Sequence, residues 1–363
     1  MKLLQELLQI SSYSGHEEKI AKYIFSYCKK NGIDVFMQEK NVIAFIAGKN
    51  KNTAFIFNAH MDTVSYGDKN LWTYPPISNN AGVITNGKIY GLGASDVKGS
   101  IAVLLQLLKE LKQTQPATDI FFAFTTQEEI DGKGTKEFLA YFQKEHAKQY
   151  KKISAIVSEA TNASTLELGH RGDIKIKITV QGQTGHASRP KEVKNHAIFQ
   201  MIEIIEEMKI FADFIEKYFS DDVLGIPTCA LTGITSNENS VNKIPSTCTT
   251  TWDIRTTPKL HTKLIPLLKK KLKNQMVIEE ISSGPPAIVK KDEAIVKLFQ
   301  KIKPDIKLTI SPGSNDMTFF IAAGIPAVTF GPGTKKVIHK ENEYIEIKKM
   351  DDSFRILKKL IIN

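Results

Sequence analysis

The sequence has few cysteines and no long apolar run, and these absences exclude several classes of protein. It contains three cysteines, Cys28, Cys229 and Cys248, and no Cys-x-x-Cys pair. This excludes a disulfide-stapled secreted domain and favours a reducing cytoplasm. No apolar run approaches the roughly 20 residues that span a bilayer. The polar N-terminus, residues 1–10, predicts an amphipathic helix rather than a secretory signal.

The positive charge of the chain does not by itself indicate nucleic-acid binding. The formal net charge is +10, but the excess is mostly lysine spread along helical stretches such as 267–273. No basic motif interleaved with aromatic residues and no zinc-finger spacing occurs. A solvated lysine-rich surface is therefore expected, and its charge can steer anionic substrates toward the protein.

Length and patterning predict two domains of different character. A chain of 363 residues exceeds what one core usually supports. Alternating strand and helix patterns run to about residue 168, which predicts a mostly parallel sheet covered by helices. Residues 174–180 then alternate strictly between apolar and polar, as in a sheet with one wet face. We predict an α/β catalytic domain, residues 1–171 and 282–363, interrupted by a smaller α+β lid and dimerisation domain, residues 172–281.

Further elements are expected within these domains. The smaller domain is predicted to contain helices around 198–219 and 260–273 and strands near 228–231 and 247–254. The last part of the chain is predicted to resume the alternation of strands and helices seen before residue 168. Its strands are expected at 306–309 and 327–330, and its helix at 350–361.

Five metal-type side chains each stand in a short context of their own, behind a strand or a glycine turn. They are His60 in Asn-Ala-His-Met-Asp, Asp96 in Gly-Ala-Ser-Asp-Val-Lys-Gly, Glu129 in Glu-Glu, Glu159 in Ser-Glu-Ala-Thr, and His339 in His-Lys-Glu-Asn-Glu. Two imidazoles and three carboxylates suit a pair of zinc-like ions if one carboxylate bridges them and one position is left for water. The combination predicts a hydrolase.

The spacing of these residues carries chemical information. His60 directly follows a predicted buried strand, 55–59. Asp62 falls on the same side of the chain as His60, where it can form a hydrogen bond with the ring nitrogen that does not bind the metal. Asp96 precedes an apolar run of helical length, 101–108, and a helix N-terminus favours its negative charge.

Glu128 and Glu129 follow another predicted strand, 120–125. Adjacent side chains after a strand point in different directions, so one can bind a metal while the other faces the reacting water as a general base. Each context alone is usually structural: a His-x-Asp pair is commonly a surface pair, and Glu-Glu is commonly solvated. Their occurrence together, in order, is not expected by chance.

These motifs resemble the M20 metallopeptidase and amidohydrolase family, and the resemblance covers essentially the whole chain. It implies that His60 and Glu159 bind one metal ion, that Glu129 and His339 bind the other, and that Asp96 bridges them. The implied cofactors are two Zn²⁺, with Co²⁺ or Mn²⁺ as alternatives. Glu128 would be the general acid/base that deprotonates a water held between the metals, and Asp62 would orient His60.

The resemblance also gives roles to residues of the smaller domain. Gly185-His186-Ala187-Ser188, Val241-Asn242-Lys243-Ile244-Pro245 and Asp253-Ile254-Arg255 resemble the substrate-gripping motifs of the family's lid. His186 would stabilise the oxyanion from the neighbouring subunit, which implies a homodimer, and Asn242 and Arg255 would hold the substrate carboxylate. Glycine-containing hinges are expected near Gly172 and at 282–284.

Two departures from the desuccinylases of the family bear on the substrate. His170 and Thr318 stand where those enzymes carry arginines, so an extra acidic group on the substrate would lack its partners. The resemblance to acetylornithine deacetylases implies removal of a small acyl group from an N-acyl amino acid, as in arginine biosynthesis. Desuccinylation and dipeptidase or carboxypeptidase activity remain alternatives. A binding protein that kept the fold and lost catalysis is a further alternative, which the presence of Glu128 and His186 disfavours.

Overall fold

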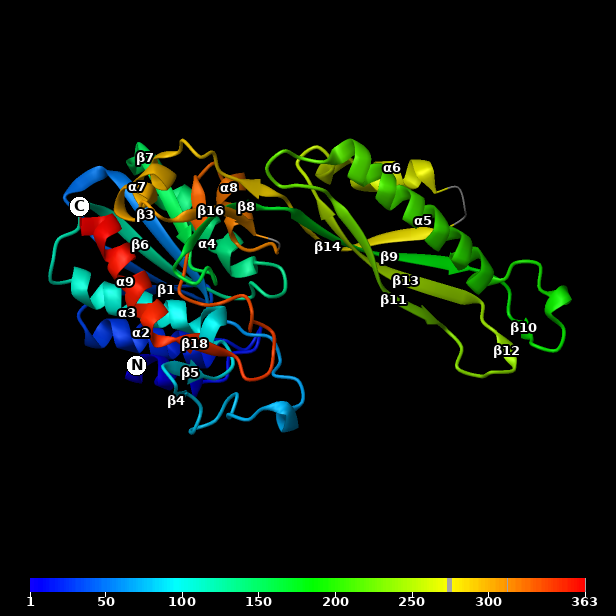
Figure 1. The fold of residues 1–363 in the computed structure, drawn as a ribbon, viewed down its shortest axis with the longest axis horizontal. Coiled ribbons are helices and arrows are strands. Elements are labelled where there is room, and N and C mark those ends of the chain that lie inside the picture. Colours follow the sequence, from blue (N-terminus) through cyan, green and yellow to red (C-terminus); the bar gives the residue numbers. More distant parts are fainter. Residues whose placement is uncertain (273–275, 312, 363) are drawn as a thin grey trace. The chain divides into compact units, whose positions relative to one another are not determined.

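The chain divides into two compact units. The computed structural model describes residues 1–272, 276–311 and 313–362. One unit comprises Met1–Gly169, Ile288–Thr309 and Asn315–Asn363, and the other comprises His170–Ala287 and Ile310–Ser314. The first unit is therefore assembled from separate stretches of the sequence (Figure 1).

A nine-stranded sheet organises the first unit. Its strands, in spatial order, are β1 (Asp34–Gln38), β2 (Asn41–Ile46), β6 (Thr118–Thr125), β3 (Asn50–His60), β7 (Lys152–Val157), β17 (Ala327–Thr329), β8 (Thr165–His170) and β15 (Ala287–Ile288), with β16 (Lys307–Ser311) paired to β8. The central strands β6, β3, β7 and β17 run parallel, and antiparallel strands flank them. Every residue of β6 is buried, as a strand covered on both faces requires. The predicted α/β class is confirmed.

Helices cover this sheet. The three helices predicted for this unit, at residues 1–10, 101–108 and 350–361, are all observed. The covering helices are α1 (Lys2–Leu8), α2 (Glu18–Lys30), α3 (Gly99–Leu111), α4 (Lys133–Glu145), α7 (Ala294–Ile302), α8 (Met317–Ala322) and α9 (Ile347–Ile362). Helix α3 is apolar on nearly all sides and packs against α9, so it belongs to the core. A small sheet of β18 (Tyr344–Glu346), β5 (Lys88–Tyr90) and β4 (Val83–Thr85) completes the unit.

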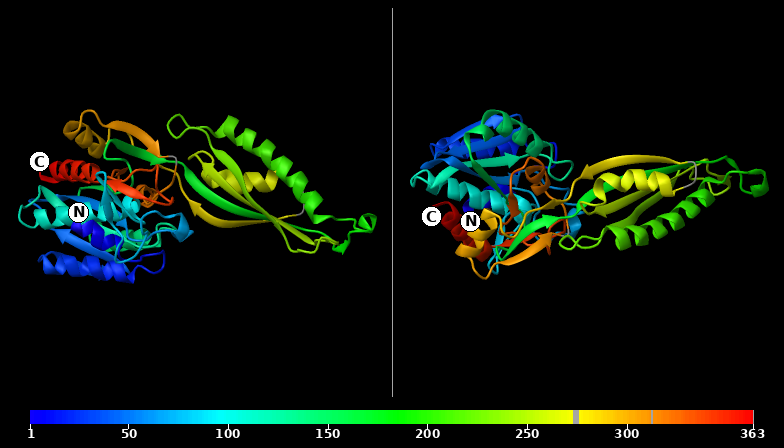
Figure 2. Two further views of the ribbon diagram at one scale, coloured as in Figure 1. Left: turned by 60° about the horizontal axis from the view of Figure 1, so that its bottom comes forward. Right: turned by 90° about the horizontal axis from the view of Figure 1, so that it is seen from above.

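The second unit is an antiparallel sheet with helices on one face. The strand order is β11 (Thr228–Ser236), β13 (Thr247–Thr256), β9 (Gly172–Gln181) and β14 (Val277–Gly284). Alternate residues of β9 and β13 form a hydrophobic core with α5 (Ala197–Phe219) and α6 (Leu264–Lys271). The long helix α5 follows the strands in both views of Figure 2. A separate pair, β10 (Gly185–His186) and β12 (Lys243–Ile244), lies beyond this sheet.

Two details differ from the sequence prediction. Strand β14 was not predicted, because a β-bulge between Glu280 and Ser282 interrupts the period-two alternation that would have revealed it. The lysine-rich helix predicted at 260–273 is observed as α6, preceded by a 3₁₀ turn, His261–Lys263, and residue 273 lies outside the described residues. Within the described ranges, no helix has the length and apolar character needed to cross a membrane.

Candidate metal centre and active site

The carboxyl ends of three neighbouring parallel strands bring most of the candidate residues together. His60 is the last residue of β3, Glu128 and Glu129 follow β6, and Glu159 follows β7. Parallel strands end at the same edge of a sheet, which is where open α/β sheets bind ligands. Asp96 reaches the same place from a turn, Ala94–Lys98, that precedes α3.

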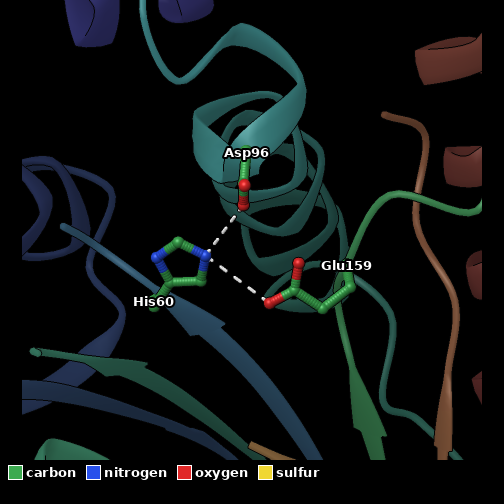
Figure 3. Close-up of side chains that lie close together, drawn as sticks. All are labelled: His60, Asp96 and Glu159. Carbon is green, nitrogen blue, oxygen red and sulfur yellow. Dashed lines mark hydrogen bonds and ion pairs between the residues drawn. The ribbon is translucent and has the colours of Figure 1, made fainter. Parts of the chain in front are cut away.

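Asp96 stands between the two histidines. Its Oδ1 lies 3.1 Å from His60 Nε2, and its Oδ2 lies 3.3 Å from His339 Nε2. Glu159 Oε1 lies 3.5 Å from His60 Nε2, and Figure 3 shows this carboxylate and Asp96 converging on the same ring nitrogen. Glu129 Oε1 lies 3.1 Å from His339 Nε2. The two carboxylate oxygens of Asp96 therefore each face a different His-carboxylate pair.

These side chains form groups compact enough to hold metal ions. His60, Asp96 and Glu159 make one group, and Asp96, Glu129 and His339 make another, with ligand atoms within 4.8 Å of one another. His60, Glu128 and Glu129 form a third group by the same criterion. Imidazole and carboxylate donors suit zinc, cobalt or manganese. The residues present therefore fit a dinuclear site.

The protonation of this cluster shows how strongly its charges interact. The carboxylates of Asp96 and Glu129 raise the pKa of His339 to about 10. Burial lowers the pKa of His60, but Glu159, Asp62 and Asp96 outweigh burial and raise it well above its ordinary value. Burial raises the pKa of Glu159 to about 8. In the metal-free protein, protons thus occupy positions that a cation would take.

Glu128 lies beside the cluster and is partly exposed. Desolvation raises its pKa well above the ordinary value, the charge of His60 opposes this shift, and the charges of Glu159 and Asp316 reinforce it. A carboxylate in such surroundings is more basic than one in water, as a proton acceptor near neutral pH requires.

Asp62 orients His60 through both its main chain and its side chain. His60 Nδ1 lies 3.1 Å from the main-chain carbonyl oxygen of Asp62 and 3.4 Å from its Oδ1. Because a carbonyl oxygen only accepts hydrogen bonds, Nδ1 carries the proton. Nε2 is then the nitrogen that can bind a metal, once it gives up the proton that the metal-free protein holds there.

The side chain of Asp62 also holds the two consecutive glutamates. Its Oδ1 accepts the backbone N–H of Glu128 at 3.1 Å, and its Oδ2 accepts that of Glu129 at 3.2 Å. Ser14 donates its hydroxyl to Oδ2 at 2.7 Å. Burial raises the pKa of Asp62, but the bonds from His60 and Ser14 outweigh burial and lower it. Local sequence patterns do not reveal Ser14, because its contact spans 48 residues of sequence.

Asp316 is a buried carboxylate near the site, and the sequence alone predicts no role for it. Thr135 donates to its Oδ2 at 2.5 Å, and its other oxygen has no hydrogen-bond partner in the described residues. Burial raises its pKa to about 6. Thr135 also bonds Thr125, and both accept from the amide of Asn58, so a buried polar network joins the ends of β3 and β6 to α8.

His186 and Asn242 lie in the second unit and are exposed. The backbone N–H of Ala187 donates to the main-chain carbonyl of Asn242 at 2.9 Å, so the two predicted residues are neighbours. The backbone N–H of Ser188 donates to His186 Nδ1 at 3.2 Å. Nδ1 is therefore an acceptor, and the ring proton resides on Nε2, where it can be donated to a ligand.

The three remaining candidates are more restricted. Arg255 already bonds Asp253 through Nε at 2.8 Å and Nη2 at 2.9 Å. His170 is fully buried, with Nδ1 2.9 Å from the carbonyl oxygen of Arg171, and Thr318 is 3% exposed. A substrate carboxylate would have to compete with Asp253 for Arg255, and contact with His170 or Thr318 would require movement of the residues that cover them.

The sequence of the chain matches a known family over most of its length. The model of peptidase family M20/M25/M40 matches residues 56–363. The chain belongs to this family. It is therefore a hydrolase, because the M20 family consists of metal-dependent hydrolases. The motifs from His60 to His339 lie within the matched residues.

Curated relatives within the family carry different substrates in their names. The chain is 29% identical to the acetylornithine deacetylase of Buchnera aphidicola subsp. Schizaphis graminum, over 85% of this chain and 80% of the relative. It is also 29% identical to a succinyl-diaminopimelate desuccinylase of Rickettsia bellii, over 95% of this chain and 91% of the relative.

Solved structures share the fold. An M20 family metallo-carboxypeptidase from Sulfolobus solfataricus superposes with a TM-score of 0.79 at 21% identity, covering 98% of this chain and 97% of that chain. A tripeptidase from Staphylococcus aureus gives a TM-score of 0.76 at 21% identity, covering 99% and 96%. These similarities establish the M20 architecture of the chain.

Proposed function

We propose that this protein is a dinuclear metal-dependent amide hydrolase that removes a small acyl group from an N-acyl-L-amino acid. The observation that carries the proposal is the placement of Asp96, whose two oxygens face His60 and His339 separately. A carboxylate shared in this way is the ligand that a pair of ions needs as a bridge.

The ligand roles follow from that geometry. His60 and Glu159 would hold one ion, Glu129 and His339 would hold the other, and Asp96 would bridge them. Zn²⁺ is the proposed metal, with Co²⁺ or Mn²⁺ as substitutes. Bound metal would lower the pKa of a water molecule to near neutrality and polarise the amide carbonyl of the substrate.

Glu128 is the proposed general acid/base. Its raised pKa makes its carboxylate form a stronger base than a carboxylate in water, which suits proton transfer from the attacking water. The same carboxyl group then returns that proton to the nitrogen of the leaving amine. Asp62 keeps this residue in place by accepting its backbone N–H.

The second unit would serve as a lid and a dimerisation domain, with predicted bounds of 172–281. His186 can donate its Nε2 proton to the developing oxyanion, because Nδ1 already accepts a hydrogen bond. We propose that it does so across a homodimer. The helix α5 leaves Phe199, Ile202 and Ile210 exposed, as expected for a surface that another subunit covers.

A small acyl group on an amino acid with a free α-carboxylate is the proposed substrate. Asn242 and Arg255 would bind the carboxylate, with Arg255 exchanging Asp253 for the ligand. His170 and Thr318 replace the arginines that a succinyl group would need. Desuccinylation is the second candidate, because the Rickettsia bellii desuccinylase aligns with 95% of this chain. Cleavage of dipeptides is a third candidate within the family.

A substrate panel tests this proposal. Metal-depleted protein, with and without added zinc or cobalt, is offered N-acetylornithine, N-acetyl-lysine, N-succinyl-diaminopimelate and several dipeptides. Metal-restored cleavage of the acetylated amino acids is expected. Preference for the succinylated compound would retain the mechanism and refute the specificity, whereas binding of metal without cleavage of any amide would indicate a protein that has lost catalysis.

A further inference from the structure

Glu343 is a buried carboxylate that accepts hydrogen bonds from the backbone of the turn that contains Asp96. Its side chain is 1% exposed and accepts three backbone N–H groups. Oε2 accepts from Gly93 at 2.8 Å, and Oε1 accepts from Ser95 at 2.7 Å and from Asp96 itself at 3.0 Å. Three backbone N–H donors converge on the two oxygens of one side chain, so this contact fixes the turn.

The turn does not hold itself through regular helical bonds. Asp96 has φ −129° and ψ 85°, and Val97 has φ −128° and ψ 29°, both outside the helical region. Buried backbone N–H groups must still find acceptors. Glu343 supplies acceptors for three of them from a segment more than 240 residues away in sequence.

Other bonds join the same two segments. The hydroxyl of Ser95 donates to the carbonyl of Tyr344 at 2.7 Å and accepts the N–H of Thr334 at 3.0 Å. The N–H of Gly91 donates to the main-chain carbonyl of Glu343 at 2.9 Å. Residues 334–344 therefore support the Asp96 turn from several directions.

The supporting segment also contains His339. One stretch of chain thus provides a candidate ligand of one ion and fixes the carboxylate proposed to bridge both. From this juxtaposition we propose that Glu343 is a positioning residue for the dinuclear centre. It holds the backbone of Asp96 so that one carboxylate oxygen faces each metal position. This inference rests on the proposed function.

The chemistry requires a carboxylate at this position. A glutamine has one acceptor oxygen, and its NH₂ group would face either the N–H of Gly93 or those of Ser95 and Asp96. Glu343→Gln therefore preserves the size of the side chain and introduces a donor opposite a donor. The expected result is a displaced Asp96 in a chain that still folds.

Cobalt binding provides the test, because cobalt reports the geometry of its site independently of activity. Glu343→Gln should bind the second cobalt ion about 10- to 100-fold more weakly than the wild type, as expected when a group supporting a ligand is lost. The magnetic coupling between the two ions, measured by electron paramagnetic resonance, should fall or disappear. Ser95→Ala, which removes a separate support of the same turn, should shift both readouts in the same direction and provides a second route if the first variant does not fold.

Asp119→Asn is the matched control. Asp119 is also a buried carboxylate that accepts a backbone N–H, from Gly48 at 2.7 Å, but it lies at the start of β6, opposite the end that leads to Glu128. The Asp119→Asn variant should have a lower melting temperature than the wild type, with cobalt binding and magnetic coupling unchanged. Wild-type affinity and coupling in Glu343→Gln would refute the positioning role. A wild-type protein that binds fewer than two cobalt ions would refute the dinuclear function and this inference together, whereas two coupled ions without amide cleavage would refute only the proposed activity.

Discussion

The two units present their candidate functional side chains in opposite ways. In the first unit, the metal-type residues other than His339 are buried or half-buried and are held by other groups, as Asp62 holds the loop of Glu128 and Glu129. In the second unit, His186 is the last residue of the two-residue strand β10, Asn242 directly precedes the two-residue strand β12, and both side chains are exposed. The proposed metal centre is thus assembled within one unit, whereas residues proposed to bind the substrate are exposed in the other.

The difference extends to the cores. The second unit is stabilised by regular alternation, with Ile174, Ile176, Ile178 and Val180 of β9 packed under α5 and α6. The first unit contains a comparable apolar core and also carries a concentrated group of interacting charges at one edge of its sheet. Burying charges without partners is costly, so we propose this group as the chemical centre of the protein.

Loss of the general base should have the largest effect. Glu128→Gln removes the proton acceptor and is expected to lower kcat by about 10²- to 10⁴-fold while leaving metal content unchanged. Steady-state kinetics and metal analysis of the purified variant measure both quantities. Glu145→Gln, an exposed change on α4, should behave as wild type. Near-normal turnover in Glu128→Gln would assign the base to another residue.

The next effect should come from an exposed residue of the second unit. His186→Ala removes the proposed oxyanion donor and should lower kcat by about 10²- to 10³-fold with unchanged metal binding. His16→Ala, an exposed histidine of the first unit, provides the control. Mixing His186→Ala with Glu128→Gln should restore part of the activity if the histidine acts across a dimer. Full activity of His186→Ala alone would confine catalysis to the first unit.

A smaller effect is expected from the residue that orients the cluster. Asp62→Asn introduces an NH₂ group next to the backbone N–H groups of Glu128 and Glu129. Metal affinity should fall by about 10- to 100-fold, which competition with a chelator can measure. Ser14→Ala removes one bond to the same carboxylate and should weaken affinity less. Equal losses in the two variants would contradict the assigned role of Asp62.

The smallest effect is a pH dependence of metal binding. Carboxylates raise the pKa of His339 to about 10, and burial raises that of Glu159 to about 8, so both groups hold protons at neutral pH in the metal-free protein. Metal must displace these protons, and its apparent affinity should therefore rise as pH increases from 7 toward 10. Calorimetry in buffers of different ionisation enthalpy measures the proton release. An affinity independent of pH would show that the ligands are already deprotonated.

The sequence predicted the regular elements well where periodicity was strong. The alternation in β9 and the apolar run of α3 gave their type and approximate bounds. Strand β14 escaped because its bulge breaks the period. Roles for Ser14, Asp316 and Glu343 were not predicted either, because each acts through hydrogen bonds to residues far away in sequence.

The sequence by itself determined the α/β class, the M20 family and the types of side chain available for metal binding. These properties depend on local periodicity and short motifs, which are readable without a fold. Tertiary structure alone decided that the two oxygens of Asp96 face His60 and His339 separately, and that Glu343 holds the turn between them. Those distances depend on the packing of strands and loops that lie up to hundreds of residues apart, and local sequence patterns do not specify such packing.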